Sequence, residues 1–248
     1  MGKIYTTKTM RNHVFDIETK ALPDKVAEFT KPFSKEDVLV GNLKDPEKIA
    51  AKQDVAEAGY WAKAHDKAAL NPHTSEIVTI GIHLDNNGET FMLDGSEAHI
   101  LGSFWGIHKQ HTQHNWCYWT GSNDKSAFDI RHIVIRSWVN QVPVPEGLVS
   151  ARGYLSNGFV DLAQVFLFGA PFPSYCSLDL AGRQLGVIGT TNDCGAVQSK
   201  TVIEEATGVT GMTFSEFWDG DDKAREQAAA YLRNDLALTR GIADIILS

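Results

Sequence analysis

Two acidic residues lie two positions apart in an apolar stretch near the start of the chain. Residues 12–19 read Asn-His-Val-Phe-Asp-Ile-Glu-Thr, and their alternating β-branched and aromatic side chains predict a strand. Because side chains of a strand alternate between faces, the carboxylates of Asp16 and Glu18 share one face. Such like charges repel and resist burial, and a divalent cation such as Mg²⁺ or Mn²⁺ would keep both ionised. The alternative is an exposed strand face without a metal.

Two further aspartates follow predicted strands. Residues 116–121 (WCYWTG) indicate a buried strand, and Asp129 falls in the first turn of the helix expected over residues 128–139. Asp129 is either a partner of the helix dipole or a third carboxylate delivered to the edge of the sheet. Residues 158–162 indicate a short strand, where we expect Asp161 to cap a helix rather than bind a metal.

A long helix is expected at the end of the chain, over residues 222–247. Tyr231 and Asp235 are one turn apart on it and therefore lie on the same face. One alternative is an exposed pair on a surface helix. The other is a functional pair, in which the tyrosine hydroxyl acts on a group bound by the aspartate carboxylate. The apolar residues recur near helical period: Ala228, Leu232, Leu236, Ile242 and Ile246.

Three histidines follow one another at three-residue spacing, at positions 108, 111 and 114. Histidines spaced in this way can bind zinc, but this run has no cysteine or acidic residue nearby. We therefore expect a solvated helix end here.

Composition restricts the class of protein. The 248 residues, 43% of them hydrophobic, suffice for one large domain with an ample core. No apolar run is long enough to span a bilayer, and residues 1–6 lack a signal peptide's apolar segment, so no membrane is expected. Three cysteines without Cys-x-x-Cys spacing favour a reducing cytoplasm. A net charge of −8 argues against tight duplex binding through phosphate neutralisation alone.

The elements between these motifs predict an α/β domain over residues 1–248. Residues 76–84 and 89–93 indicate a hairpin, which with the first strand makes an antiparallel meander. A mostly helical insertion is expected at about 21–71, and a smaller loop insertion at about 187–211. Further expected features are a helix start at Asp45-Pro46, a helix cap at Ser96 and a short helix over residues 177–186.

In order along the chain, three segments resemble the three motifs of DEDD-type 3′–5′ exonucleases, the DnaQ-like nucleases of the ribonuclease H fold. They are residues 15–19 (FDIET), residues 122–130 (SNDKSAFDI) with Asp129, and Tyr-x-x-x-Asp at Tyr231 and Asp235. The tyrosine marks one subclass, since the sister subclass has a histidine where this chain has Ala230. The whole chain looks most like stand-alone relatives of the exonuclease domain of family-B DNA polymerases. In one departure, Asn123 lies six residues before Asp129, where the family's asparagine lies four or five before.

The resemblance implies a ribonuclease H-like fold with a mixed five-stranded sheet, and a reaction with two divalent metal ions, Mg²⁺ or Mn²⁺. It implies that Asp16 bridges both ions, Glu18 and Asp235 complete the first, and Asp129 holds the second. Tyr231 would orient the attacking water. The substrate side would be formed by Thr19, Lys20, Asn123 and Phe128, with Trp119 and Phe128 available for stacking on a base unless both are core residues.

The implied substrate is DNA with a 3′ end, preferably single-stranded, from which mononucleotides are released. RNA is an alternative, because related ribonucleases use the same site architecture. A second alternative is a non-catalytic module that binds nucleic acid or a polymerase. A replication or repair polymerase is a possible partner, and we expect any proofreading to occur in trans. The sequence does not distinguish proofreading from DNA repair, recombination or degradation. The oligomeric state is not predicted.

Overall fold

The computed structural model describes residues 10–85, 87–121, 128–148 and 158–248. The chain divides into two compact units, one made of residues 1–18 and 77–248 and the other of residues 19–76. None of the described helices is long and apolar enough to cross a membrane.

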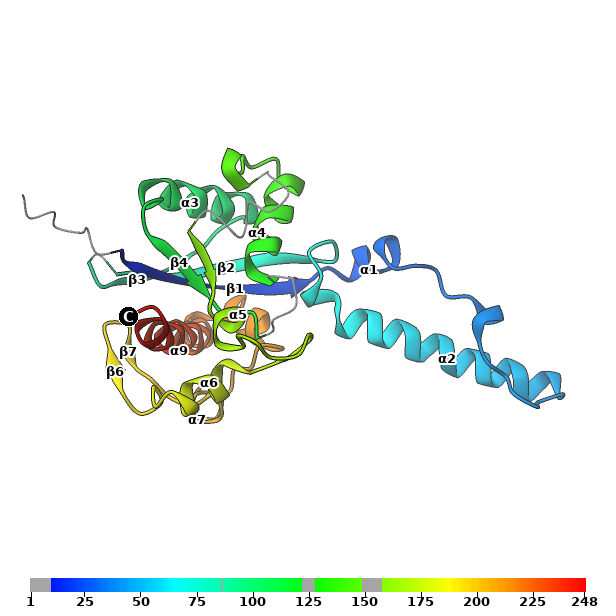
Figure 1. Ribbon diagram of the computed structural model, residues 1–248. Helices are drawn as coiled ribbons and strands as arrows, with labels where there is room; N and C mark the ends of the chain where they lie inside the picture. The colour runs from blue at the N-terminus through cyan, green and yellow to red at the C-terminus, as the bar shows by residue number, and fades with distance from the viewer. Residues whose placement is uncertain (1–9, 86, 122–127, 149–157) are drawn as a thin grey trace, which may run out of the picture. The chain divides into compact units, whose positions relative to one another are not determined.

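A mixed five-stranded sheet forms the centre of the larger unit, in the order β3-β2-β1-β4-β5 (Figure 1). β1 is parallel to β4, β4 is parallel to β5, and β2 is antiparallel to β3. The first residue of β1 donates its N–H to Asp85, just after β2, at 3.0 Å, so β1 and β2 run antiparallel. The expected meander and mixed sheet are therefore confirmed. The strands are β1 (Asn12–Ala21), β2 (Ser75–Leu84), β3 (Glu89–Leu93), β4 (Asn115–Tyr118) and β5 (Phe159–Asp161).

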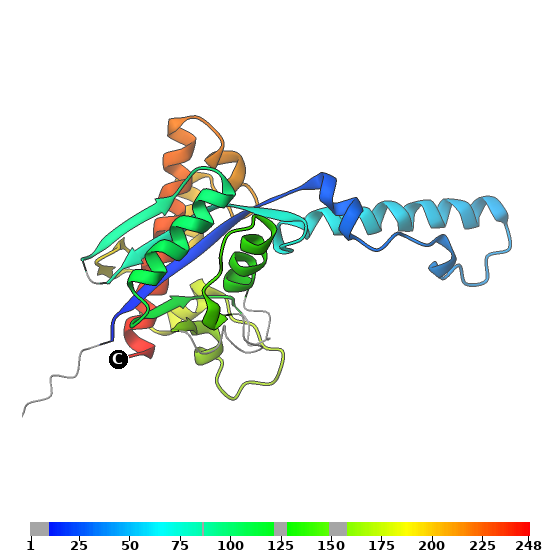
Figure 2. The same ribbon diagram turned by 90° about the horizontal axis from the view of Figure 1, so that it is seen from above.

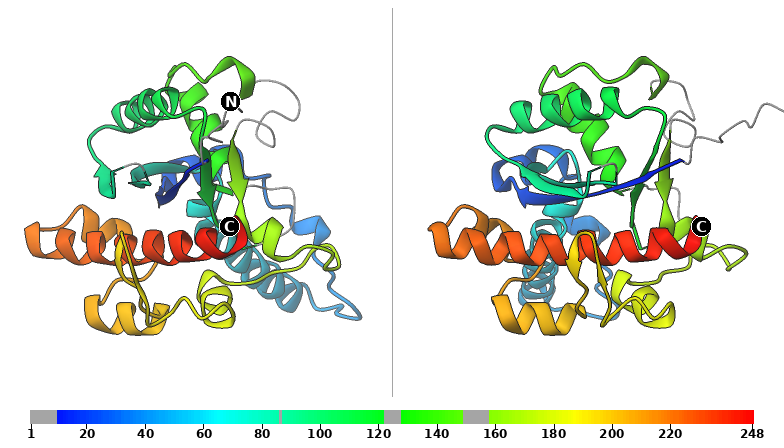
Figure 3. Two further views of the ribbon diagram at one scale, coloured as in Figure 1. Left: turned by 60° about the vertical axis from the view of Figure 1, so that its left-hand side comes forward. Right: turned by 90° about the vertical axis from the view of Figure 1, so that its left-hand side faces the viewer.

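Helices cover both faces of this sheet. On one face, α3 (Glu97–Gln110) and α4 (Phe128–Val139) enclose an aromatic core that includes Phe15 of β1 and Trp116 of β4. Figure 2 looks down on this helical layer. On the other face lies α9 (Asp222–Ile246), which runs beneath the strands in Figure 3. The shorter helices and strands on that side are α5 (Leu162–Phe166), α6 (Leu178–Gln184), β6 (Thr191–Asn192), β7 (Gly195–Ala196), α7 (Lys200–Thr207) and α8 (Phe214–Trp218).

α9 approaches the sheet closely because β2 has a glycine at the contact. A Cβ atom on Gly81 would lie 3.0 Å from side-chain carbons of both Leu232 and Leu236. The buried Arg240, farther along α9, donates to the carbonyl of Asn12 at 3.0 Å and to the carboxylate of Asp85 at 2.9 Å. These contacts fix both the distance between α9 and the sheet and the position of α9 along β1.

A buried ion pair positions α4 in the same way. Arg136 donates from Nε and Nη2 to the two carboxylate oxygens of Glu97 in α3, at 2.8 and 2.6 Å. The same carboxylate accepts from the Asn140 amide at 2.7 Å. These contacts tie the C-terminal end of α4 to the start of α3, while Asp129 lies at the opposite end of α4.

The unit formed by residues 19–76 is helical and contains the segment expected as an insertion. Its elements are α1 (Pro23–Phe29), η1 (Lys35–Asp37), α2 (Pro46–Asp66) and η2 (Ala68–Leu70), with the strand ends that enter and leave it. α2 begins where predicted, and the Asp45 side chain accepts from the N–H of Glu47 at 3.0 Å. No residue of α2 is buried.

The segment of about 187–211, predicted to be a loop insertion, contains two short strands and a helix. A small hairpin, β6–β7, comes first, and the helix α7 follows with Ser199 as its N-cap and Gly208 (φ 73°) as its C-cap. A serine before and a glycine after an eight-residue segment are helix boundary signals, which the abundance of Gly, Thr and Asn around them obscured. This helix matters because its first residue reaches the site described next.

Candidate active site

Asp16 and Glu18 project from β1 toward α9, as the alternation of strand side chains requires. Both are half-buried, and they line a cavity of about 260 Å³ between the sheet and the helices. One carboxylate oxygen from each lies within 4.8 Å of an oxygen of Asp235, so three acids converge. The exposed-face alternative is therefore wrong for this strand.

α9 contributes Asp235 and Tyr231 to the same cavity. Their exposed fractions are only 4% and 2%, so the pair is not a surface pair. The helix begins at a cap, where Asp221 accepts from the N–H of Ala224 at 2.8 Å, and its apolar face packs on the sheet beside the acid. The 3.6-residue period then places both polar side chains over β1.

Asp129 also lines the cavity, from the first turn of α4. Its side chain is 3% exposed, and its Oδ2 atom has no hydrogen-bond partner within the described parts of the chain. Burial and the charge of Asp16 raise the pKa of Asp129 well above its usual value. The carboxylate therefore lies inside the site rather than serving the helix dipole alone.

The four carboxylates strongly disfavour one another's ionisation. Burial, with a contribution from Asp235, raises the pKa of Asp16 to about 7. Burial and the charges of Asp16 and Asp235 raise the pKa of Glu18 well above its usual value, and burial raises that of Asp235. Cations bound among these oxygens would offset the repulsion, and hard divalent ions prefer such ligands.

Lys200, at the start of α7, is a residue of the site that the sequence did not reveal. Its ammonium nitrogen lies 2.5 Å from Oδ2 of Asp235 and 4.2 Å from the centre of the Tyr231 ring. Burial lowers the pKa of Lys200, but Asp235 and Tyr231 outweigh this and raise it above its usual range. A lysine in the first turn of a helix opposes the helix dipole, and that mismatch was the available signal.

The predicted substrate residues have different outcomes. Phe128 lines the cavity, and so does Trp119, whose indole N–H donates to the Cys176 carbonyl at 3.2 Å. Thr19 belongs to the unit of residues 19–76, and its hydroxyl donates to the Ala69 carbonyl at 2.7 Å. Lys20 belongs to that unit as well, and Asn123 lies outside the described residues.

Asp161 caps α5, as expected, rather than lining the cavity. One of its oxygens accepts from the N–H of Ala163 at 3.0 Å, and the other accepts from the Thr120 hydroxyl at 2.5 Å. Three further residues line the cavity and were not predicted from the sequence: Thr120, Leu178 and Gly211.

The three histidines at the end of α3 were expected to be exposed to solvent, and this prediction is wrong for two of them. His108 is 3% exposed and stacks on Phe159, with ring centres 4.8 Å apart. His114 is 7% exposed, while His111 is partly exposed. His108 and His114 are buried because the turn after α3 folds back onto the aromatic core.

Neither the known protein families, nor curated proteins, nor solved structures provide a match to this chain. The function must therefore be argued from the site itself.

Proposed function

We propose that this chain is a metal-dependent 3′–5′ exonuclease on a ribonuclease H-like fold, and that it releases nucleoside monophosphates from single-stranded DNA. The observation that carries the proposal is the convergence of Asp16, Glu18, Asp129 and Asp235 on one cavity beside Tyr231. The resemblance of the three segments to the exonuclease motifs supports the reaction and its polarity.

The donor set suits the two Mg²⁺ or Mn²⁺ ions that such a reaction requires. All four acids offer oxygen atoms, and Oδ2 of Asp129 and Oδ1 of Asp235 are buried without a hydrogen-bond partner in the described chain. When bound, divalent ions activate water as a nucleophile and stabilise charge on the leaving 3′ oxygen.

Each residue has a separate task in this proposal. Asp16, Glu18, Asp129 and Asp235 would hold the ions, with Asp16 shared between them, Glu18 and Asp235 on the first and Asp129 on the second. The Tyr231 hydroxyl forms a hydrogen bond with the attacking water. This hydrogen bond keeps the water in line with the phosphorus–oxygen bond that breaks. Lys200 keeps Asp235 and Tyr231 in position.

The cavity wall offers a place for the terminal base. Phe128 and Trp119 present ring surface beside the acids, and bases stack on such rings with little sequence preference. Thr19, Lys20 and Asn123 stay predictions as contacts to the terminal nucleotide.

A binding module without catalysis explains the site less well. Burial, with smaller contributions from neighbouring carboxylates, raises the pKa of these acids, so ionising them destabilises the metal-free fold. A protein that only binds nucleic acid would gain nothing from this cost. RNA remains the second candidate substrate, because the lining residues contain no specific reader of a 2′-hydroxyl.

The test is cleavage of a 5′-labelled single-stranded oligonucleotide, made as DNA and as RNA of one sequence. We expect a ladder that shortens from the 3′ end, abolished by EDTA and restored by Mg²⁺ or Mn²⁺, with DNA cut faster. Asp16→Ala and Asp235→Ala should be nearly inactive, whereas the exposed Asp222→Ala on the same helix should retain activity. Cutting of a circular single strand, or binding without any cleavage, would contradict the proposal.

A further inference from the structure

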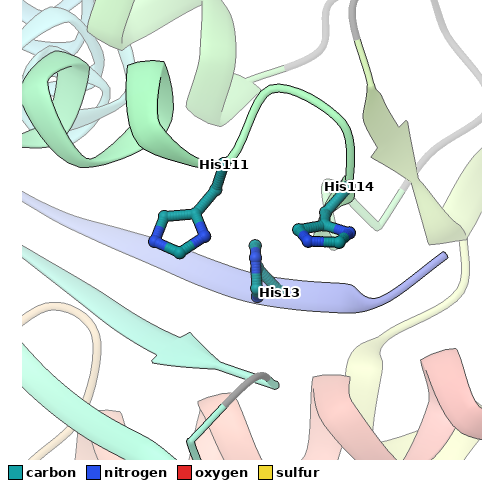
Figure 4. A group of neighbouring side chains, drawn as sticks. All are labelled: His13, His111 and His114. Atoms are coloured by element: carbon teal, nitrogen blue, oxygen red, sulfur yellow. The ribbon is translucent and has the colours of Figure 1, made fainter. Parts of the chain in front are cut away.

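Three histidine rings meet on the face of β1 that lies away from the carboxylates. His13 comes from the start of β1, His111 is the C-cap of α3, and His114 precedes β4. Figure 4 shows the ring of His13 standing between the other two. Its ring centre is 4.9 Å from that of His111 and 5.1 Å from that of His114.

The ring of His13 contains an unexplained polar atom. The side chain is fully buried, and its Nε2 atom has no hydrogen-bond partner in the described chain. Buried polar atoms of this kind are uncommon in folded proteins, and a bound ion or ligand is one accepted explanation for them. Burial, with the neighbouring His111 and His114, lowers the pKa of His13 to about 4, so the ring is neutral at pH 7 and can be a ligand.

We propose that His13, His111 and His114 form a binding site for a divalent transition metal ion, with Zn²⁺ as its best fit. One ring nitrogen from each histidine lies within 4.8 Å of the other two. With Zn–N bonds of about 2.0–2.1 Å, tetrahedral zinc places the centres of bound imidazoles roughly 5 Å apart. The two ring pairs that include His13 have this spacing, and the ring centres of His111 and His114, now 6.3 Å apart, would move closer on binding. Imidazole favours zinc over Mg²⁺, and three ligands leave one position open for water or another donor.

Metal binding has to displace existing hydrogen bonds. Nδ1 of His13 accepts the N–H of Asp85 at 3.0 Å, which leaves the ring proton on Nε2. Binding a metal through Nε2 moves that proton to Nδ1 and sacrifices this hydrogen bond, at a cost of about tenfold to a hundredfold in affinity. Two of the contacts of His114 are long: its Nδ1 accepts the N–H of Arg11 at 3.4 Å, and its Nε2 lies 3.3 Å from the amide nitrogen of the exposed Gln113.

The position of the site indicates a structural role. His13 and Asp16 lie on opposite faces of β1, because odd and even positions of a strand alternate. The ion would join the first strand to the connection between α3 and β4. This site is independent of the proposed nuclease reaction, and either can exist without the other.

The test is calorimetric titration with Zn²⁺ in excess Mg²⁺, using the full chain with Asp16→Asn and Asp235→Asn, so that the carboxylate cavity does not compete. We expect one Zn²⁺ per chain and a rise in Tm. In this parent protein, a further His111→Ala or His114→Ala substitution should weaken Zn²⁺ binding on the order of 100-fold. The matched control is His99→Ala, since His99 is exposed on the same helix as the C-cap histidine and should bind as the parent does.

Co²⁺ supplies a second measurement that does not depend on stability. A visible absorption band of tetrahedral Co²⁺ should appear in the parent and the His99→Ala protein and be absent from the His111→Ala and His114→Ala proteins, whose folding is checked by circular dichroism. Absence of Zn²⁺ binding in the parent, or undiminished binding in both variants, would overturn the proposal.

Discussion

The ammonium nitrogen of Lys200 lies 2.5 Å from Oδ2 of Asp235 and also over the ring of Tyr231, at 4.2 Å from its centre. One cation thus contacts both residues that α9 brings to the cavity. Lys200 is about one-third exposed, whereas its acidic partner is almost fully buried. The lysine therefore compensates a buried charge and holds the side chain that we propose orients the water.

Lys200→Met should lower kcat about 10- to 100-fold, because Asp235 and Tyr231 lose the charged group that positions them. KM should change little, since the lysine is proposed to act through these residues and not on the bound strand. Steady-state kinetics on the single-stranded oligonucleotide measure both constants. Lys223→Met is the matched control, because Lys223 is exposed on α9, and it should behave as wild type. Equal kcat in both variants would remove Lys200 from the mechanism.

Tyr231→Phe removes one hydroxyl and no charge, so binding of metal and DNA should be almost unchanged. The hydrogen bond lost is made mainly in the transition state, and kcat should fall on the order of 100-fold while KM stays similar. Single-turnover kinetics and Mg²⁺ titration separate the two effects. A fully active Phe variant alongside an inactive Asp235→Asn variant would show that the metal site works without the tyrosine.

The stability of the metal-free protein should fall as pH rises. Burial and Asp235 raise the pKa of Asp16 to about 7, above its usual 3.8, so the folded state favours the protonated acid. This contribution is fully present below about pH 4 and is lost as the pH rises through 7. Between pH 5 and 8 a loss of about 2 kcal/mol would lower Tm by roughly 4–8 °C.

Asp16→Asn keeps the neutral form at every pH and should make this dependence shallower in thermal melts recorded with EDTA, while Glu18, Asp129 and Asp235 still contribute to it. Adding Mg²⁺ should restore Tm most at pH 8, where the acids are ionised. A metal-free Tm that rises steadily from pH 5 to 8 would contradict the expected sign.

The ion pair between Arg136 and Glu97 should matter for stability, because both side chains are less than 10% exposed. Glu97→Gln leaves the guanidinium buried without its counter-charge, and the free energy of unfolding should drop by about 3–5 kcal/mol. Urea denaturation measures the change. The exposed pair of Arg233 and Glu226 is the control, and Glu226→Gln should cost less than about 1 kcal/mol. Similar losses of unfolding free energy in Glu97→Gln and Glu226→Gln would mean that burial does not determine how much the Arg136–Glu97 pair contributes to stability.

Several features of this protein were determined by the sequence alone, because they depend on neighbours within one or two turns. The alternation in β1 put Asp16 and Glu18 on one face, and the period of α9 put Tyr231 one turn from Asp235. Helix caps such as Ser96 were likewise predicted, and here its hydroxyl accepts from the N–H of His99 at 3.3 Å. The antiparallel meander of β1, β2 and β3 followed from strand patterns and a hairpin turn, whereas the mixed five-stranded sheet was expected from the family resemblance.

Other features were decided only by the tertiary structure, because they join residues far apart in the chain. Lys200 meets Asp235 because α7 packs beside α9, and His13 meets His111 because β1 pairs with β4 below the end of α3. Burial of His108 likewise depends on the residues that pack over the end of α3, whereas the spacing of the histidines in the sequence had predicted that this end is exposed to solvent. Side-chain period is a local property that sequence encodes directly, whereas the meeting of distant groups depends on how whole elements pack.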